Sequence, residues 1–371
     1  MNIEKVKQSL LYVKLKKKLK GTTFYKNLTK ATWDEYKQFE LGIYEKLSQN
    51  PYSIINTLKK YFTKDTFGEI YQENLNYIEN AIKLKIADYE EFERAMNFLI
   101  VSYALDILLV KSIEEYGNQV FFIKEEFWRL LNQTDFPENI EAKFISPPYN
   151  AFVIKLENYP KREEELKLTE MFVKFEEIKD KNLLYISIIY EHSNGKMFNK
   201  LPIQIYHSRE DTLEKIKKEI DKNIENFLNA TNAKGDIALQ TAITIKSLSR
   251  IIINFLLYLN HINDDTSSIE TAPEKLIKRK EFYEKQNNRK KLEKINKEIS
   301  RYTKIHIVGT KTAQYYYSEL EKAGKPKKPH WRRGHIRFLK HPKYKKDWTY
   351  VRPALIGKGK IDKDKERIYT T

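Results

Sequence analysis

The sequence predicts an α+β protein with an N-terminal helical bundle, a central antiparallel sheet with helices, and a small basic C-terminal α+β domain. Three observations predict this class. Apolar residues recur at helical spacing before residue 134, runs typical of strands follow residue 150, and the excess positive charge is confined to the last quarter. A chain of 371 residues is long enough for two or three domains. We place them at residues 1–134, 135–265 and 266–371.

The first region is predicted to be helical from Thr32 to about Gln133. Between Asp88 and Glu115 the apolar residues recur mostly three and four positions apart, which is the spacing of one helix face. Asn50-Pro51 is typical of a turn followed by a helix start. Glycine and proline are few here, so the region favours a compact helical bundle.

The pattern changes after Pro137 and Pro147-Pro148, which interrupt any helix. Four segments are then typical of strands: Ala151 to Leu156, Met171 to Phe175, Leu183 to Tyr190 and Leu201 to His207. The third is apolar at both parities, which predicts burial on both faces. A Ser-Asn-Gly-Lys turn at 193–196 makes residues 183–207 a hairpin, so an antiparallel sheet is expected.

Helices are expected to resume at Thr212 to Asn229 and at Asp236 to His261, the second as a buried core helix because residues 245–259 are largely apolar. Asn263 to Pro273 has the polar composition of a linker. From Pro273 to Ser300 the charges fall on every face, which predicts a solvated or a polyanion-binding helix. Ile305 to Val308 is a short strand, and residues 348–356 are expected to pair with the segment that begins at His330.

The charge is distributed unevenly along the chain. Residues 274–371 hold 30 Lys and Arg against 11 Asp and Glu, whereas the first 273 residues hold 38 against 40. A near-neutral chain with one basic end is expected to bind a polyanion there, and a nucleic acid is the favoured one. The arginines carry more weight than the lysines, since a planar guanidinium holds phosphate through two hydrogen bonds.

Several classes of site are excluded or disfavoured. The chain has no cysteine, which excludes disulfides, thiolate metal sites and cysteine nucleophiles. It has no His-Glu-x-x-His motif, no Gly-rich phosphate loop and no nucleophile elbow, and His330 and His335 are five apart, which suits neither one helix face nor one strand face. We therefore expect no metal and no cofactor. Lysines interrupt the N-terminus and the apolar runs are too short or contain Asp106, so we expect no membrane segment and a cytoplasmic location.

The candidate catalytic residues lie in the segment His330-Trp331-Arg332-Arg333-Gly334-His335-Ile336-Arg337. In an extended chain Arg333, His335 and Arg337 share one face and form an anion cradle. Neighbouring cations would lower the pKa of the imidazole and favour its neutral, proton-accepting form. Such a group could take the 2′-hydroxyl proton of RNA while guanidinium groups stabilise the developing charge. A metal-independent ribonuclease with His335, Arg333 and His330 as catalytic residues is therefore one hypothesis.

Nucleic-acid-binding residues are expected around the same segment: Arg332, Arg337, Trp331, Arg352, Lys340 and Trp348. The tryptophans could stack on unpaired bases. The alternative is that both rings build the core of a small domain and that the lysines of residues 341–347 form a solvated loop. We favour a functional role for the trio Arg333, His335 and Arg337.

The spacing His-x-x-Arg-Gly-His-x-Arg at 330–337, followed by a Val-Arg-Pro strand at 348–357, resembles the C-terminal signature of a set of phage- and plasmid-encoded proteins. The set includes the type V-A anti-CRISPR protein that suppresses biogenesis of its target nuclease. The Pro147-Pro148 turn before an apolar strand and the Lys278-Arg279-Lys280 cluster fit the same pattern. The resemblance spans residues 144–357 and leaves out the helical N-terminal third. It implies a protein that engages the nascent N-terminal peptide of a CRISPR nuclease and causes loss of the encoding mRNA.

These observations favour a regulator that recognises RNA, specifically mRNA, together with a nascent CRISPR nuclease polypeptide or the translating ribosome, and down-regulates the target mRNA. Two alternatives stay open. One is a non-enzymatic protein-interaction inhibitor in which the His/Arg motif holds the C-terminal domain together. The other is a DNA-binding plasmid or phage regulator, which ranks last because the sequence has no clear helix-turn-helix.

Overall fold

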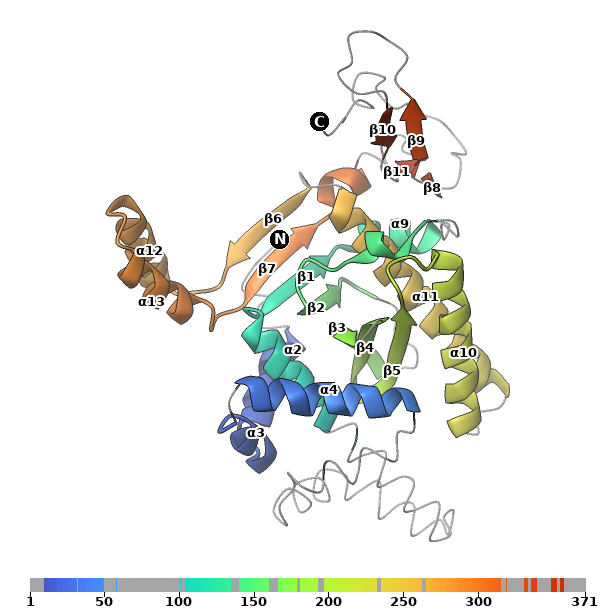
Figure 1. Ribbon diagram of the computed structural model, residues 1–371, viewed down its shortest axis with the longest axis horizontal. Helices are drawn as coiled ribbons and strands as arrows, with labels where there is room; N and C mark the ends of the chain where they lie inside the picture. The colour runs from blue at the N-terminus through green and yellow to red at the C-terminus, as the bar shows by residue number, and fades with distance from the viewer. Residues whose placement is uncertain are drawn as a thin grey trace.

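The computed structural model shown in Figure 1 describes a defined part of the chain. The described residues are 10–31, 33–49, 58, 101, 104–134, 140–159, 166–178, 181–192, 197–231, 235–261, 265–314, 318, 330–332, 335–338, 348–351 and 354–356. From residue 330 onwards only the backbone is described.

Helices and strands alternate in blocks along these residues. The helices are α2 (Leu11–Lys20), α3 (Thr23–Leu28), α4 (Trp33–Gln49), α9 (Glu125–Gln133), the short 3-10 helix η1 (Ala142–Ile145), α10 (Leu213–Thr231), α11 (Gly235–His261), α12 (Glu274–Lys285) and α13 (Arg289–Ile299), with further helical residues at 104–115 and 310–314. The strands are β1 (Gln119–Ile123), β2 (Ala151–Leu156), β3 (Leu166–Ile178), β4 (Lys181–His192), β5 (Met197–His207), β6 (Thr266–Glu270), β7 (Lys304–Val308), β8 (His330–Arg332), β9 (His335–Phe338), β10 (Trp348–Val351) and β11 (Ala354–Ile356). The α+β class predicted from the sequence is confirmed.

Seven strands form the central sheet in the order β5-β4-β3-β2-β1-β7-β6 (Figure 1). Strands β2 to β5 pair antiparallel with their neighbours, as the sequence predicted for this stretch. Strand β1 pairs parallel with both β2 and β7, and β6 then pairs antiparallel with β7. The sheet is therefore mixed, and β6 and β7 belong to it although they follow residue 265.

Two segments differ from the sequence prediction. Residues 119–123 were expected to be helical and form β1, and the expected linker at 263–273 contains β6. All five residues of β1 are buried, so they form a continuous apolar run that periodicity cannot assign to a strand or a helix. Strand β6 is polar and lies at the sheet edge, where its backbone pairing with β7 supplies the order.

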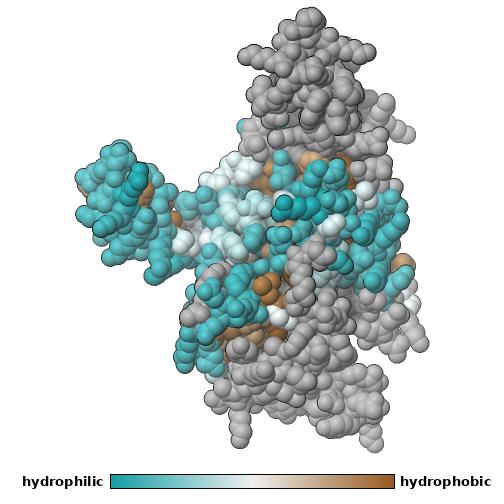
Figure 2. Space-filling model, in the orientation of Figure 1, coloured by the Kyte–Doolittle hydropathy of each residue, from teal (hydrophilic) through white to brown (hydrophobic). Residues whose placement is uncertain are grey.

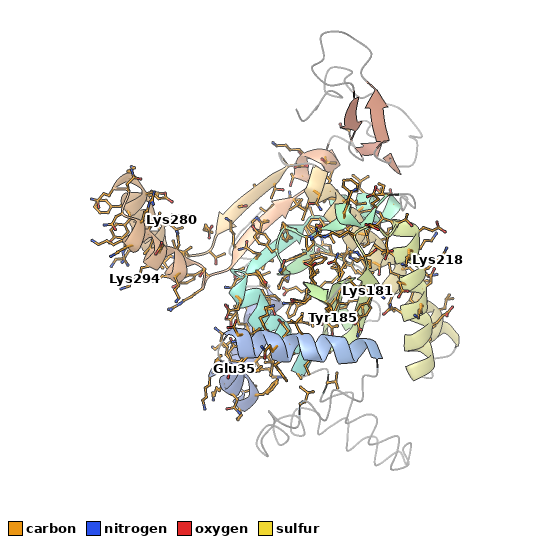
Figure 3. The ribbon with its side chains drawn as sticks, in the orientation of Figure 1. Glu35, Lys181, Tyr185, Lys218, Lys280 and Lys294 are labelled. Atoms are coloured by element: carbon orange, nitrogen blue, oxygen red, sulfur yellow. The ribbon has the colours of Figure 1, made fainter. Side chains whose placement is uncertain are left out.

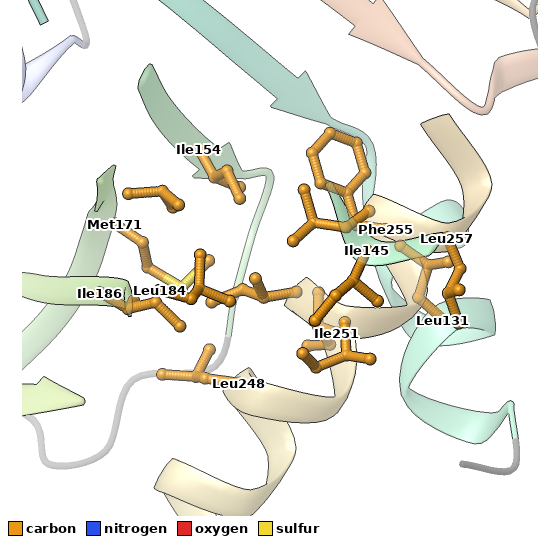
Figure 4. Close-up of a cluster of buried hydrophobic side chains, with 14 of the residues drawn as sticks. Leu131, Ile145, Ile154, Met171, Leu184, Ile186, Leu248, Ile251, Phe255 and Leu257 are labelled. Atoms are coloured by element: carbon orange, nitrogen blue, oxygen red, sulfur yellow. The ribbon is translucent and has the colours of Figure 1, made fainter. Parts of the chain in front are cut away.

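Helices cover both faces of the central sheet, because alternate strand residues enter two different cores. On one face Ile154, Met171 and Ile186 pack in a core that also contains residues of α9, η1, α10 and α11 (Figure 4). On the other face their neighbours, such as Phe172 and Tyr185, pack in a core with α2, α3, α4 and residues 101–113. Strand β4 is buried on both faces, as its apolar run predicted.

Helix α11 is the core helix expected from the sequence. Within the described residues, its segment Ala242–Asn260 is the one helix long and apolar enough to cross a membrane. Most of that segment is buried in the protein, with Leu248, Ile251 and Phe255 in the core against the sheet. Its apolar character is therefore explained by the sheet face that it covers.

A buried group of charges ties the N-terminal helices to the sheet. The ammonium of Lys174 on β3 lies 3.2 Å from a carboxylate oxygen of Glu40 on α4 and 2.9 Å from one of Glu176, and the side chains of Lys174 and Glu40 are fully buried. Lys37 contacts the same two carboxylates at 2.9 and 3.2 Å. Burial alone would raise the pKa of Glu40, but Lys174 and Lys37, with the hydroxyl of Ser112, hold it below its usual value. The group therefore stays charged and paired.

We expect Lys174→Met to destabilise the protein by about 3 kcal/mol, because removing one partner leaves buried carboxylates incompletely paired. Urea unfolding followed by circular dichroism measures the change. Lys181→Met on the neighbouring strand is the matched control, since Lys181 is exposed, and should change the free energy of unfolding by less than about 0.5 kcal/mol. Equal effects of the two substitutions would contradict a stabilising role for the buried pair.

Candidate nucleic-acid interface

The predicted His/Arg motif folds as two short antiparallel ladders. Strand β9 pairs with β10, with His335 opposite Val351 and Arg337 opposite Thr349. Strand β8 pairs with β11, with Trp331 opposite Leu355. The expectation that residues 348–356 pair with the motif is confirmed. The motif is divided between the two ladders, since His330 to Arg332 belong to one and His335 to Phe338 to the other.

Alternation along these strands places His335 and Arg337 at positions of the same parity, as it does His330 and Arg332. The side chains of these four residues, and those of Trp331 and Trp348, lie outside the described part of the structure, and Arg333, Lys340 and Arg352 lie outside it entirely. The convergence of guanidinium and imidazole groups into one anion pocket stays a prediction.

The second basic element is the helical hairpin of α12 and α13, which the sequence analysis treated as one charged segment. The two helices are joined at residues 286–288, where Asn287 has a φ of 51°. Asparagine is one of the few residues other than glycine that adopt this left-handed conformation readily. The helices pack on a small core of Ala272, Ile295 and Ile299, and the hairpin stands clear of the body (Figure 2).

The hairpin has a net positive charge. Residues 274–299 hold ten Lys and Arg against five Asp and Glu. The ion pairs within it join Lys278 to Glu274 at 2.6 Å, Lys280 to Glu284 at 3.8 Å and Arg279 to Glu298 at 3.8 Å. Most other cations face solvent, which makes the hairpin the most basic surface among residues whose side chains the structure describes.

Asp265 has a structural role, as the sequence analysis expected of a loop or cap residue. Its carboxylate accepts hydrogen bonds from the hydroxyl of Tyr258 at 2.6 Å and from the backbone N–H groups of Lys311 and Thr312 at 2.9 and 2.8 Å. Burial opposes ionisation, but these hydrogen bonds hold the pKa of Asp265 below its usual value. The carboxylate therefore caps the helix at 310–314 and ties it to α11. Its neighbour Asp264 lies outside the described residues.

His306 joins three strands of the sheet. Its Nε2 lies 2.7 Å from Oε1 of Gln119 on β1, and its Nδ1 lies 2.8 Å from the hydroxyl of Ser268 on β6. The ring stacks on Phe121 with the centroids 4.8 Å apart. Burial, with a smaller effect of nearby Lys304, lowers the pKa of His306 to about 4. The imidazole is therefore neutral at physiological pH and serves the fold.

The described residues contain no group of three or more His, Asp or Glu side chains placed to hold a metal ion. His207 is also buried, with Nδ1 3.1 Å from the carbonyl of Ser208, which agrees with the structural role expected for it. His192, His261 and His341 have no described side chain.

Comparison with known proteins identifies one family. The family model described as "AcrVA2-like: Anti-CRISPR type V subtype A2 family" matches residues 121–358, more than half of the chain. A solved structure described as "Crystal structure of AcrVA2" is 10% identical and covers 70% of this chain and 76% of its own, with a TM-score of 0.38. No curated protein matches the chain.

The stabilising effect of His306 should depend on pH between about 4 and 6.5. In the unfolded chain the ring takes up a proton near pH 6.5, whereas in the folded protein it resists protonation until about pH 4. Stability from the neutral ring is therefore fully present above pH 6.5 and falls as the pH is lowered through this window.

We expect the difference in unfolding free energy between the wild type and His306→Gln to shrink by about 2 kcal/mol from pH 7 to pH 4.5, after allowance for solvent screening. Urea unfolding at the two pH values measures it. The variant serves as the control for carboxylates and for His207, which titrate in both proteins. A difference that does not change with pH would contradict a buried neutral ring.

Proposed function

Because the chain belongs to the anti-CRISPR type V subtype A2 family, we propose that it recognises a nascent protein together with RNA and down-regulates the mRNA that encodes that protein. The target is a type V-A CRISPR nuclease, recognised through its N-terminal peptide as it leaves the ribosome. This reaction takes place in the cytoplasm, where translation occurs.

The observation that carries the proposal is the separation of charge between the two parts of the chain. The first 273 residues are near neutral, and residues 274–371 hold 19 more positive than negative charges. The basic part includes a hairpin that stands clear of the core (Figure 2). An excess of lysine and arginine on a projecting element is suited to phosphate contacts, which supply most of the affinity for nucleic acid.

The remainder of the protein is suited to recognition of a polypeptide. Its charges are largely paired inside the fold, as in the group around Lys174, and its sheet is covered on both faces. We assign protein recognition to this near-neutral body and RNA recognition to the basic part. Coupling the two would restrict the response to an mRNA whose own product is being translated.

The His/Arg motif adds a second candidate activity, metal-independent cleavage of the RNA. His335 and Arg337 have the same parity on β9, which supports a cradle of alternating cations and imidazole. In this hypothesis His335 takes the proton of the 2′-hydroxyl, and Arg333, with His330, stabilises charge on the phosphate.

A cell-based reporter tests the proposed function. The first codons of a type V-A nuclease are fused to a fluorescent protein, and a control mRNA carries two compensating frameshifts that change the peptide but little of the RNA. We expect the protein to lower the abundance of the first mRNA and to leave the second unchanged, as measured by quantitative PCR. An Arg333→Ala/His335→Ala double variant should lose the effect. Equal loss of both mRNAs would contradict recognition of the nascent peptide.

Cleavage is tested separately with purified protein and labelled single-stranded RNA in the presence of EDTA. If the motif is catalytic, His335→Ala and Arg333→Ala should each reduce the rate by about a hundredfold or more, because general base catalysis commonly contributes that much. Lys345→Ala is the control and should leave the rate within about twofold. Intact RNA with the wild-type protein would reject the nuclease hypothesis and leave RNA recognition to be judged by binding.

A further inference from the structure

The hairpin of α12 and α13 is an addition to the sheet that the main cores do not need. It is inserted between β6, which ends at Glu270, and β7, which begins at Lys304. These strands already pair over their full length, and the hairpin's apolar residues form a separate cluster with Ala272. A shorter connection between two antiparallel strands would complete the sheet equally well. The 26 residues of the hairpin are therefore best explained by what they contact outside the fold.

Helix α13 presents a line of lysines directly opposite its packing face. Lys290, Lys294 and Lys297 are spaced four and three residues apart, which places them on one side of an α-helix over about 10 Å. All three are exposed, and none has an ion-pair partner among the described residues. The buried Ile295 and Ile299 lie on the other side of the helix.

Helix α12 exposes an aromatic ring among cations. Phe282 is 54% exposed, which is unusual for so large an apolar side chain. It lines a shallow surface depression with Lys275, Lys278, Arg279 and Glu274. Solvent-exposed phenylalanine beside lysine and arginine is the combination by which proteins hold single-stranded nucleic acid, since the ring stacks on a base and the cations contact the adjoining phosphates.

The distribution of these groups favours a nucleic acid over a membrane surface. A helix that lies on a membrane needs one broad apolar face and cations on the other. In this hairpin the residues Leu276, Ile277, Tyr283 and Leu292 pack inward with the small core, so each helix offers solvent a mainly charged face (Figure 3). Phe282 alone is exposed among the large apolar residues of the two helices.

We propose that the α12–α13 hairpin is an RNA-binding arm that holds an unpaired segment, with Phe282 stacked on a base and Lys275, Lys278 and the α13 lysines on phosphates. This inference rests on the RNA recognition proposed above and places a contact point outside the His/Arg motif. The specificity it adds is for single-stranded over duplex RNA, because a paired base does not offer its face to a ring.

The test measures the affinity of the full-length protein for a fluorescently labelled 12-nucleotide oligouridylate and for an RNA duplex of the same length, at four salt concentrations. Two variants are compared with the wild type: Phe282→Ala, and Lys290→Ala/Lys294→Ala/Lys297→Ala. Leu239→Ala, an exposed apolar residue on α11 away from the hairpin, is the matched control. All substituted side chains are exposed, and circular dichroism verifies that each variant folds.

We expect Phe282→Ala to weaken oligouridylate binding about tenfold and to change duplex binding little, because stacking of one base is lost. The triple lysine variant should reduce the slope of log affinity against log salt by about 2, since each phosphate contact on a single strand contributes about 0.7. Ultraviolet crosslinking followed by mass spectrometry should locate uridine on the peptide that contains Phe282.

The outcomes separate this inference from the proposed function. If the wild type binds oligouridylate and both hairpin variants bind equally well, the arm is rejected while RNA recognition stands. If no protein binds RNA, the proposed RNA recognition fails and the arm fails with it. Binding of the wild type to vesicles of anionic lipid, lost in Phe282→Ala while RNA binding is unchanged, would identify a membrane-binding hairpin and overturn the proposal.

Discussion

The fold depends on covering both faces of one seven-stranded sheet. Strands β1 and β2 are buried along their whole length, so neither face can be left to solvent. One face is covered by α9, α10 and α11, and the other by helices that precede residue 115. The family match begins at residue 121, within β1. The N-terminal helices therefore lie outside the matched region but bury a face of the sheet inside it.

Charge is handled differently in the body and in the hairpin. In the body, cations are paired with buried or half-buried carboxylates, as Lys174 is with Glu40 and Lys155 with Glu170. These pairs connect separate elements and leave no large net charge. The hairpin instead keeps twice as many cations as anions on a small separate core. A polyanion can therefore bind the hairpin without competing with the interactions that hold the body together.

The sequence was most informative where local pattern and final environment agree. Alternating or continuous apolar runs predicted strands at 151–156, 171–175 and 183–207, and the long apolar helix at 236–261 was predicted as a core helix. The pairing of residues 348–356 with the His/Arg motif was also predicted. By contrast, β1 and β6 were missed. One has no periodicity because it is buried on all sides, and the other is polar and is ordered by its partner's backbone.

By itself, the sequence determined the α+β class, the absence of cysteine chemistry, the concentration of positive charge after residue 273 and the local spacing of the His/Arg motif. These properties are set by composition and by residues close together in the chain. Only the tertiary structure decided that β1 is parallel to β2 and β7, that His306 is buried against Gln119, and that the charged segment folds back as a hairpin exposing Phe282. The physical reason is that these features depend on contacts between residues far apart in sequence, whose free energy no local pattern records.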